Sequence, residues 1–180
     1  TDESVYKNES SLVLRYVQKY LKKYVLDNND IDVFIFSWET DKEEEFKQYL
    51  NPKKMQLVPQ IDFEIPKHLK GNNDKRVLAH YSRWYGFREV MKLKQQFETE
   101  NNFKYDLVVN ARFDLCFNRY INFNNFDNNN FHIPINLRET HYGWPDSGPE
   151  ILDHIFASSS DTMDSYSNLF EKLDEYTLPG

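Results

Sequence analysis

The stretch that decides the fold is YDLVVNARFD, which runs from residue 105 to residue 114. Its apolar centre, LVV, predicts a short strand buried on both faces. Side chains alternate along a strand, so Asn110, Arg112 and Asp114 are expected on one face. Ligands of open α/β sheets bind beyond the carboxyl ends of the strands. The trio therefore predicts a binding site, although an Arg–Asp ion pair that closes a sheet edge explains the same residues.

Helical and strand patterns alternate along the rest of the chain. Predicted helices cover Ser10–Leu26, Lys42–Leu50, Arg76–Glu100 and Thr162–Tyr176. Predicted strands cover Val33–Phe36, Met55–Val58, Leu107–Ala111 and Ile155–Ser158, with short ones at Cys116–Phe123 and Asn130–Pro134. This order predicts an α/β fold with a mostly parallel central sheet flanked by helices, in which the strands at 33–36 and 107–111 are interior. The two extra strands are expected to form an antiparallel insert over the open end of the sheet.

Length and composition narrow the class of protein. A chain of 180 residues predicts one domain over residues 1–180. The net charge of -7 argues against nucleic acid as a partner. No run of about 18 apolar residues occurs and residues 1–10 lack a signal-peptide pattern, so we expect a soluble, cytoplasmic protein without a membrane span. The single cysteine, Cys116, cannot form an internal disulfide.

Polar and aromatic residues at the strand ends are the candidates for chemistry. Ser37, Trp38 and Glu39 follow the strand at 33–36. The tryptophans Trp38, Trp84 and Trp144 are able to stack on a base or a sugar ring, although core or rim packing explains such rings as well. Arg112 has the fork geometry that suits a diphosphate.

Asp153 lies between a Gly/Pro-rich loop and the strand at 155–158. A carboxylate in that position is able to act as general base toward an acceptor hydroxyl, and a turn residue is the alternative interpretation. His154 is a second candidate base, although a histidine beside a strand is often a hydrogen-bonded structural residue. The sequence has no metal-spaced His/Cys cluster, no Gly-x-Ser-x-Gly and no Walker or Rossmann glycine motif. The absence of these motifs from the sequence weighs against hydrolase, P-loop and dehydrogenase functions.

Four motifs in this order resemble glycosyltransferases of the GT-A type: DVFIFSWET, SRWYGFREVMKLKQQFE, YDLVVNARFDLCF and ILDHIFASS. The resemblance is strongest to WavE-like lipopolysaccharide-synthesis proteins and related uncharacterised sugar transferases of bacteria and viruses. It implies a GT-A-like fold and transfer of a sugar from a nucleotide-sugar donor to a glycan or lipid-linked acceptor in surface polysaccharide synthesis. Arg112-Phe113-Asp114 stands where such enzymes have Asp-x-Asp, which implies Mn²⁺ or Mg²⁺ at Asp114. Asp153 matches the family's aspartate before an aromatic-rich strand of the "FASS" type, which makes it the expected catalytic residue.

The sequence departs from that family in two places. The first Asp of Asp-x-Asp is replaced by Arg112, and the family's opening strand and Ser-Gly-Gln-type loop have no counterpart ahead of the first predicted helix. A non-catalytic GT-A-like domain that binds carbohydrate or a protein is therefore the alternative hypothesis. The candidate substrate-binding residues are Asn110, Arg112, Trp38, Arg83, Trp84, Trp144 and Asp146.

Overall fold

The computed structural model describes residues 17–71, 74–113, 115, 117–136, 150–151 and 154–176. They belong to two compact units. One, the β3 unit, is drawn from Thr1–Ile31 and Tyr105–Ser160, and the other, the α3 unit, from Asp32–Lys104 and Asp161–Gly180. The described residues mix helices and strands, which confirms the α/β class in its general form. The prediction of a single domain over residues 1–180 stays a prediction.

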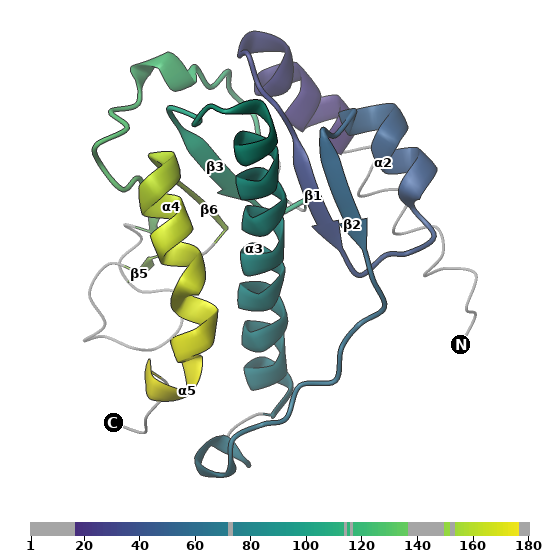
Figure 1. Cartoon of the computed structure of the whole chain (residues 1–180), viewed down its shortest axis with the longest axis vertical. Coiled ribbons are helices and arrows are strands. Elements are labelled where there is room, and N and C mark those ends of the chain that lie inside the picture. Colours follow the sequence, from purple (N-terminus) through teal and green to yellow (C-terminus); the bar gives the residue numbers. More distant parts are fainter. Residues whose placement is uncertain are drawn as a thin grey trace. The chain divides into compact units, whose positions relative to one another are not determined.

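The α3 unit contains one parallel strand pair with a helical crossover (Figure 1). Its elements are β1 (Phe34–Ser37), α2 (Glu43–Leu50), β2 (Lys54–Leu57), η3 (Lys67–Leu69) and α3 (Asp74–Asn101), followed by α4 (Ser160–Ser167), η5 (Asn168–Lys172) and α5 (Leu173–Tyr176). Strand β1 pairs with β2 from Phe34 opposite Lys54 to Ser37 opposite Leu57. The predicted strands at 33–36 and 55–58 are thus confirmed to within one residue. Both end at the same edge, as parallel strands must.

Helix α2 follows the charge rules for helix ends. Glu43, Glu44 and Glu45 occupy its first turn, where the helix dipole favours negative charge. Its N-cap is Lys42, whose side chain makes no capping hydrogen bond. At the other end Asn51 adopts a left-handed conformation with φ of 44°. Asparagine tolerates that conformation better than most residues, and the helix ends there.

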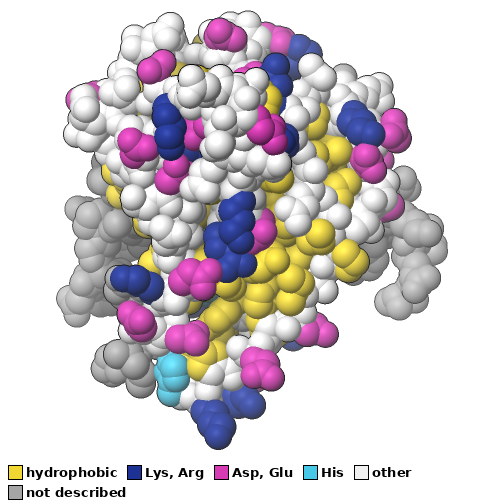
Figure 2. All heavy atoms as spheres, in the orientation of Figure 1, with side chains coloured by type: hydrophobic (Ala, Val, Ile, Leu, Met, Phe, Trp, Pro, Cys, Tyr) yellow, Lys and Arg dark blue, Asp and Glu magenta, His cyan; other side chains and the backbone are white. Residues whose placement is uncertain are grey.

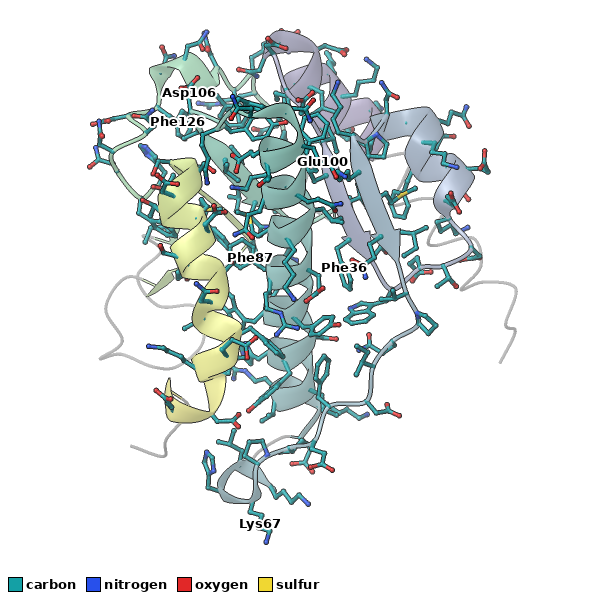
Figure 3. The ribbon with its side chains drawn as sticks, in the orientation of Figure 1. Phe36, Lys67, Phe87, Glu100, Asp106 and Phe126 are labelled. Carbon is teal, nitrogen blue, oxygen red and sulfur yellow. The ribbon has the colours of Figure 1, made fainter. Side chains whose placement is uncertain are left out.

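Helix α3 is covered by other elements on two of its sides. It packs against β1 and β2 on one side and against η5 on the other. Figure 3 shows Phe36 on the strand side, and Phe87 points toward α4, where its ring lies 5.9 Å from that of Tyr166. Gly86 allows the close approach to β1, since a Cβ at this position would lie 3.3 Å from Cδ1 of Phe36.

A buried charge network joins the carboxyl-terminal part of α3 to α4. The ammonium group of Lys94 lies 2.9 Å from the carboxylate of Glu98 and 2.6 Å from that of Asp164. The side chains of Lys94 and Glu98 are only 3% and 2% exposed. Lys104 adds contacts at 3.1 Å to Asp164 and 3.2 Å to Asp161. The hydrogen bond to Asp164 raises the pKa of Lys104 above its usual range.

The β3 unit has two short antiparallel sheets. Its described elements are η1 (Val17–Lys22), η2 (Leu26–Asn28), β3 (Val108–Ala111), η4 (Phe123–Asn125), β4 (Ile135–Asn136), β5 (Glu150–Ile151) and β6 (Ile155–Ser158). Strand β3 pairs with β6, and β4 with β5. The predicted strands at 107–111 and 155–158 are confirmed, and their pairing is antiparallel. Across the described parts of both units the sheets are each two-stranded.

The stretch after β3 differs from the prediction. In its described residues, 117–122 form no strand and 123–125 form a 3-10 turn, so the predicted strand at 116–123 is wrong there. Asn29 explains the path of this segment: its side chain donates to the carbonyl of Ile121 at 2.8 Å and accepts from the backbone of Phe123 at 2.8 Å. Those polar contacts replace a strand partner. At 130–134 only His132 forms a β-bridge, to Ala157.

Replacement of Gly86 tests the close approach of α3 to β1. Gly86→Leu inserts a side chain against Phe36 and should lower the free energy of unfolding by about 1–3 kcal/mol. The matched control is Ala79→Leu on the exposed part of the same helix, where we expect a change within about 0.5 kcal/mol. Urea unfolding followed by circular dichroism measures both. Equal effects would mean that residue 86 has room for a side chain.

Removal of Lys94 tests the buried charge network. Lys94→Met leaves the carboxylates of Glu98 and Asp164 without their buried cation, and should destabilise the fold by about 3–5 kcal/mol. The control is Lys47→Met, which removes an exposed ion pair to Glu43 and should cost about 0–1 kcal/mol. Thermal and urea unfolding of the two variants compare the sites. A loss as small as that of the control would show that the network adds no stability.

Candidate substrate-binding site

The carboxyl ends of β1 and β2 lie in the position where α/β sheets bind ligands. Strand β1 ends at Ser37, whose hydroxyl accepts a hydrogen bond from the backbone of Glu39 at 3.1 Å. That bond turns the chain directly after the strand. Trp38 lies in this turn and is half-buried, whereas Glu39 is exposed. The predicted candidate Trp38 is therefore at a strand end.

Trp38 belongs to a connected cluster of six rings, which we call the aromatic face. Its members are Phe36, Trp38, Phe63, Tyr81, Tyr85 and Phe170. Trp38 stacks on Tyr85 with ring centroids 5.5 Å apart and an interplanar angle of 24°. Phe63, from the loop after β2, contacts Trp38, Tyr81, Tyr85 and Phe170 at 5.6–6.5 Å. Rings from a strand end, a loop, α3 and η5 therefore meet in one place.

Arg88 covers one part of the aromatic face. Its guanidinium lies 4.8 Å from the ring centroid of Tyr85 and 4.3 Å from that of Phe170, which is cation–π distance. It also lies 2.9 Å from the carboxylate of Glu89 and pairs with Glu171. The positive charge of Arg88 is thus balanced by two carboxylates, so this residue is a poor anchor for a phosphate.

Tyr81 is the most buried ring of the aromatic face, with 8% of its surface exposed. Its hydroxyl donates a hydrogen bond to the carboxylate of Asp174. Burial and this hydrogen bond raise the pKa of Tyr81 to about 12. The neutral phenol is therefore the stable form at physiological pH, and Tyr81 acts as a hydrogen-bond donor that holds α5.

The other candidates on α3 have different surroundings. The ring of Trp84 lies 6.0 Å from that of Phe87 and 5.5 Å from that of Tyr166 of α4. Trp84 thus packs between α3 and α4, which agrees with the alternative interpretation of this ring as a core residue. Arg83 is half-buried on the same helix.

Asn110 and Arg112 lie in the β3 unit. Asn110 is opposite Phe156 in the β3–β6 pair. The pairing continues past the strand, because the backbone of Arg112 donates a hydrogen bond to the carbonyl of His154 at 3.0 Å. Arg112 is exposed. Antiparallel pairing of β3 with β6 therefore brings together two segments with candidate residues, the one with Asn110 and Arg112 and the one with His154.

Four predicted site residues lie outside the described residues: Asp114, Trp144, Asp146 and Asp153. Their roles stay predictions. Among the residues that the structure does describe, no three His, Cys, Asp or Glu side chains are grouped in a way that would hold a metal ion. In the same residues no helix has the length and apolarity needed to cross a membrane.

Sequence reasoning missed most of the aromatic face. Tyr81 and Tyr85 lie within the predicted helix Arg76–Glu100 without a predicted role, and neither Phe63 nor Phe170 follows a predicted strand. Phe63 carries the one available signal, since it is the only aromatic residue in the loop from Val58 to Pro66 and stands between two acids.

Comparison of the chain with protein-family models, curated proteins and solved structures found no match. The arguments about function therefore rest on the residues and their geometry.

The pKa of Tyr81 predicts a change of stability at alkaline pH. Because the folded state raises this pKa from 10.0 to about 12, its contribution is complete below pH 10 and is lost as the pH rises toward 12. Tyr81→Phe should remove that dependence, which amounts to roughly 1–2 kcal/mol. The control is Tyr120→Phe, which changes a ring that is 65% exposed. Urea unfolding between pH 9 and pH 12 compares the variants, and identical pH profiles for wild type and Tyr81→Phe would contradict the assignment.

Proposed function

We propose that this chain is a cytoplasmic glycosyltransferase that moves a sugar from a nucleotide-sugar donor to a glycan or lipid-linked acceptor in surface polysaccharide synthesis. The observation that carries the proposal is the position of Trp38 and its ring cluster at the carboxyl end of the parallel pair β1–β2. Small-molecule sites in α/β proteins form at such ends and are lined by aromatic residues with few polar groups. The finer fold proposal is a GT-A-like domain whose central sheet is mostly parallel.

The polar candidates divide the binding of the donor between them. Arg112, which is exposed at the end of β3, would pair with the diphosphate. Asn110 would donate to the same group or to the ribose. The Asp114 carboxylate would hold Mn²⁺ or Mg²⁺, which supplies neutralisation of the leaving diphosphate. One carboxylate together with substrate phosphates is a usual set of ligands for such ions.

Asp153 would carry the chemical step as general base. Its carboxylate would take the proton of the acceptor hydroxyl while the acceptor oxygen bonds to the anomeric carbon of the donor. The bond from that carbon to the diphosphate breaks in the same reaction, and the electron pair leaves with the diphosphate. Trp144 and Asp146, which precede β5 in the sequence, would contact the substrates.

A non-catalytic domain that binds carbohydrate or a protein is the second candidate function. One observation favours it: the aromatic face is assembled from residues of the α3 unit alone, without Asp114 or Asp153. Such a surface binds a sugar ring whether or not transfer follows.

Titration with nucleotide sugars separates the two functions. Purified protein is mixed with UDP-, GDP- and CMP-sugars, with and without Mn²⁺, and melting temperature and donor hydrolysis are recorded. A transferase should bind one donor class and hydrolyse it slowly. A donor at about 100-fold excess over its Kd stabilises the fold by about 2.7 kcal/mol, which a thermal melt resolves. If no donor is bound and none is hydrolysed, the transferase is excluded.

Asp114→Asn tests the proposed ligand of the cation. The amide keeps the shape of the side chain and loses its charge, so the variant should stay folded and lose the Mn²⁺-dependent part of donor binding. Asp106→Asn is the control, because Asp106 is an exposed acid of the same segment, labelled in Figure 3. A variant that melts lower and keeps the full donor-induced shift would make Asp114 a structural residue.

A further inference from the structure

Most of the aromatic face is half-buried, so that part of each ring reaches solvent. Of its six rings only Tyr81 is buried, and the neighbouring Ile61 is 39% exposed. Figure 2 shows a continuous band of hydrophobic side chains beside α3, on the side of β1 and β2, with acidic side chains, a histidine and basic side chains near its lower end. Exposed apolar surface that is continuous and has a polar border marks a contact with another molecule.

The chemistry of the border favours a sugar over an apolar partner. Gln60 and Ser82 are hydrogen-bonded to each other at 2.7 Å beside the loop that carries Phe63. Exposed carboxylates flank the rings in the sequence, and an ionised carboxylate only accepts hydrogen bonds. A pyranose offers a flat apolar face to a ring and hydroxyl donors at its edge. A lipid chain or an apolar helix offers these acceptors no hydroxyl donors.

The charge of the border excludes an anionic ligand. The two loops that follow β1 and β2, residues 38–42 and 58–66, carry four exposed acids: Glu39, Asp41, Asp62 and Glu64. Their one cation, Lys42, lies 3.0 Å from Glu45. The cation over the rings, Arg88, is balanced by Glu89 and Glu171. A phosphate or a sugar acid at the aromatic face would therefore meet uncompensated negative charge.

We propose that the aromatic face binds a neutral or cationic pyranose, with the sugar ring on Trp38 and Phe63 and its hydroxyls donating to the carboxylates of the two loops. If the chain has the proposed function, this sugar is part of the acceptor, because the donor carries a negatively charged diphosphate. Only this role as acceptor rests on the proposed function. Acceptors that end in a sialic acid, a uronic acid or a phosphorylated sugar are disfavoured. Binding of the sugar itself does not depend on transfer.

A matched pair of oligosaccharides tests the proposal. Lactose is neutral, and 3′-sialyllactose adds one carboxylate to the same disaccharide. Saturation-transfer NMR and tryptophan fluorescence of the full chain should show lactose binding, and 3′-sialyllactose should bind at least about fivefold more weakly because like charges meet. The difference should shrink in 1 M NaCl, where charges are screened beyond about 3 Å, while lactose binding stays unchanged.

Two kinds of variant locate the site. Trp38→Leu and Phe63→Leu keep an apolar side chain and remove the flat ring, and each should weaken lactose binding by about fivefold or more. Tyr120→Leu is the control, because Tyr120 is 65% exposed and is not part of the aromatic face, and should leave the affinity unchanged. The double change Asp62→Lys and Glu64→Lys alters exposed side chains only, so the fold is retained, and should reverse the preference in favour of 3′-sialyllactose.

Three binding results would overturn the proposal: no binding of lactose, equal binding of the two sugars at low salt, or lactose binding that Trp38→Leu leaves intact. A dimer in light scattering that Trp38→Leu dissociates would also overturn it, because the face would then be a contact between two copies. Donor hydrolysis is measured on the same samples. Donor hydrolysis without lactose binding refutes the sugar face alone, and lactose binding without any donor binding or hydrolysis refutes the transferase alone.

Discussion

The approach of helix α3 to strand β1 at Gly86 is the constraint on which the α3 unit depends. With no side chain at this position, the ring of Phe36 lies against the helix. That approach brings Tyr85, one residue earlier, within stacking distance of Trp38 at the end of the strand. A bulkier residue would move the helix and with it the rings that line the strand ends. The candidate site therefore depends on a residue that has no side chain.

Helix α3 has two regions of different chemistry along its length. Its middle carries the tyrosines of the aromatic face, and its carboxyl-terminal part carries the buried pair Lys94 and Glu98. Burial of charge is costly, and only good geometry with several partners offsets that cost. Asp164 provides such a partner, and because an ion pair is specific in position it fixes α4 against one turn of α3. Apolar contacts alone would permit more positions of α4 along α3.

Local patterns of sequence predicted the elements well and their partners poorly. The strand at 155–158 was predicted at its true bounds, because an apolar run between polar residues is a local signal. Its antiparallel pairing with β3 is a contact between residues about 47 positions apart, which periodicity does not encode. Trp38 was found because it follows a strand. Lys94 and Glu98 were missed because charged residues on a long helix are usually exposed, and no local pattern shows that Asp164 of α4 pairs with Lys94.

The division of the chain into two units has a consequence for dissecting the protein. Each unit is built from two separate segments, so the backbone passes from one unit to the other three times, between residues 31 and 32, 104 and 105, and 160 and 161. No single cut, by a protease or by gene truncation, yields either unit whole. A fragment that ends at Lys104 keeps Lys94 and Glu98 and loses Asp164. Circular permutation, with residues 1 and 180 joined and new ends opened at one of these passages, keeps every segment present.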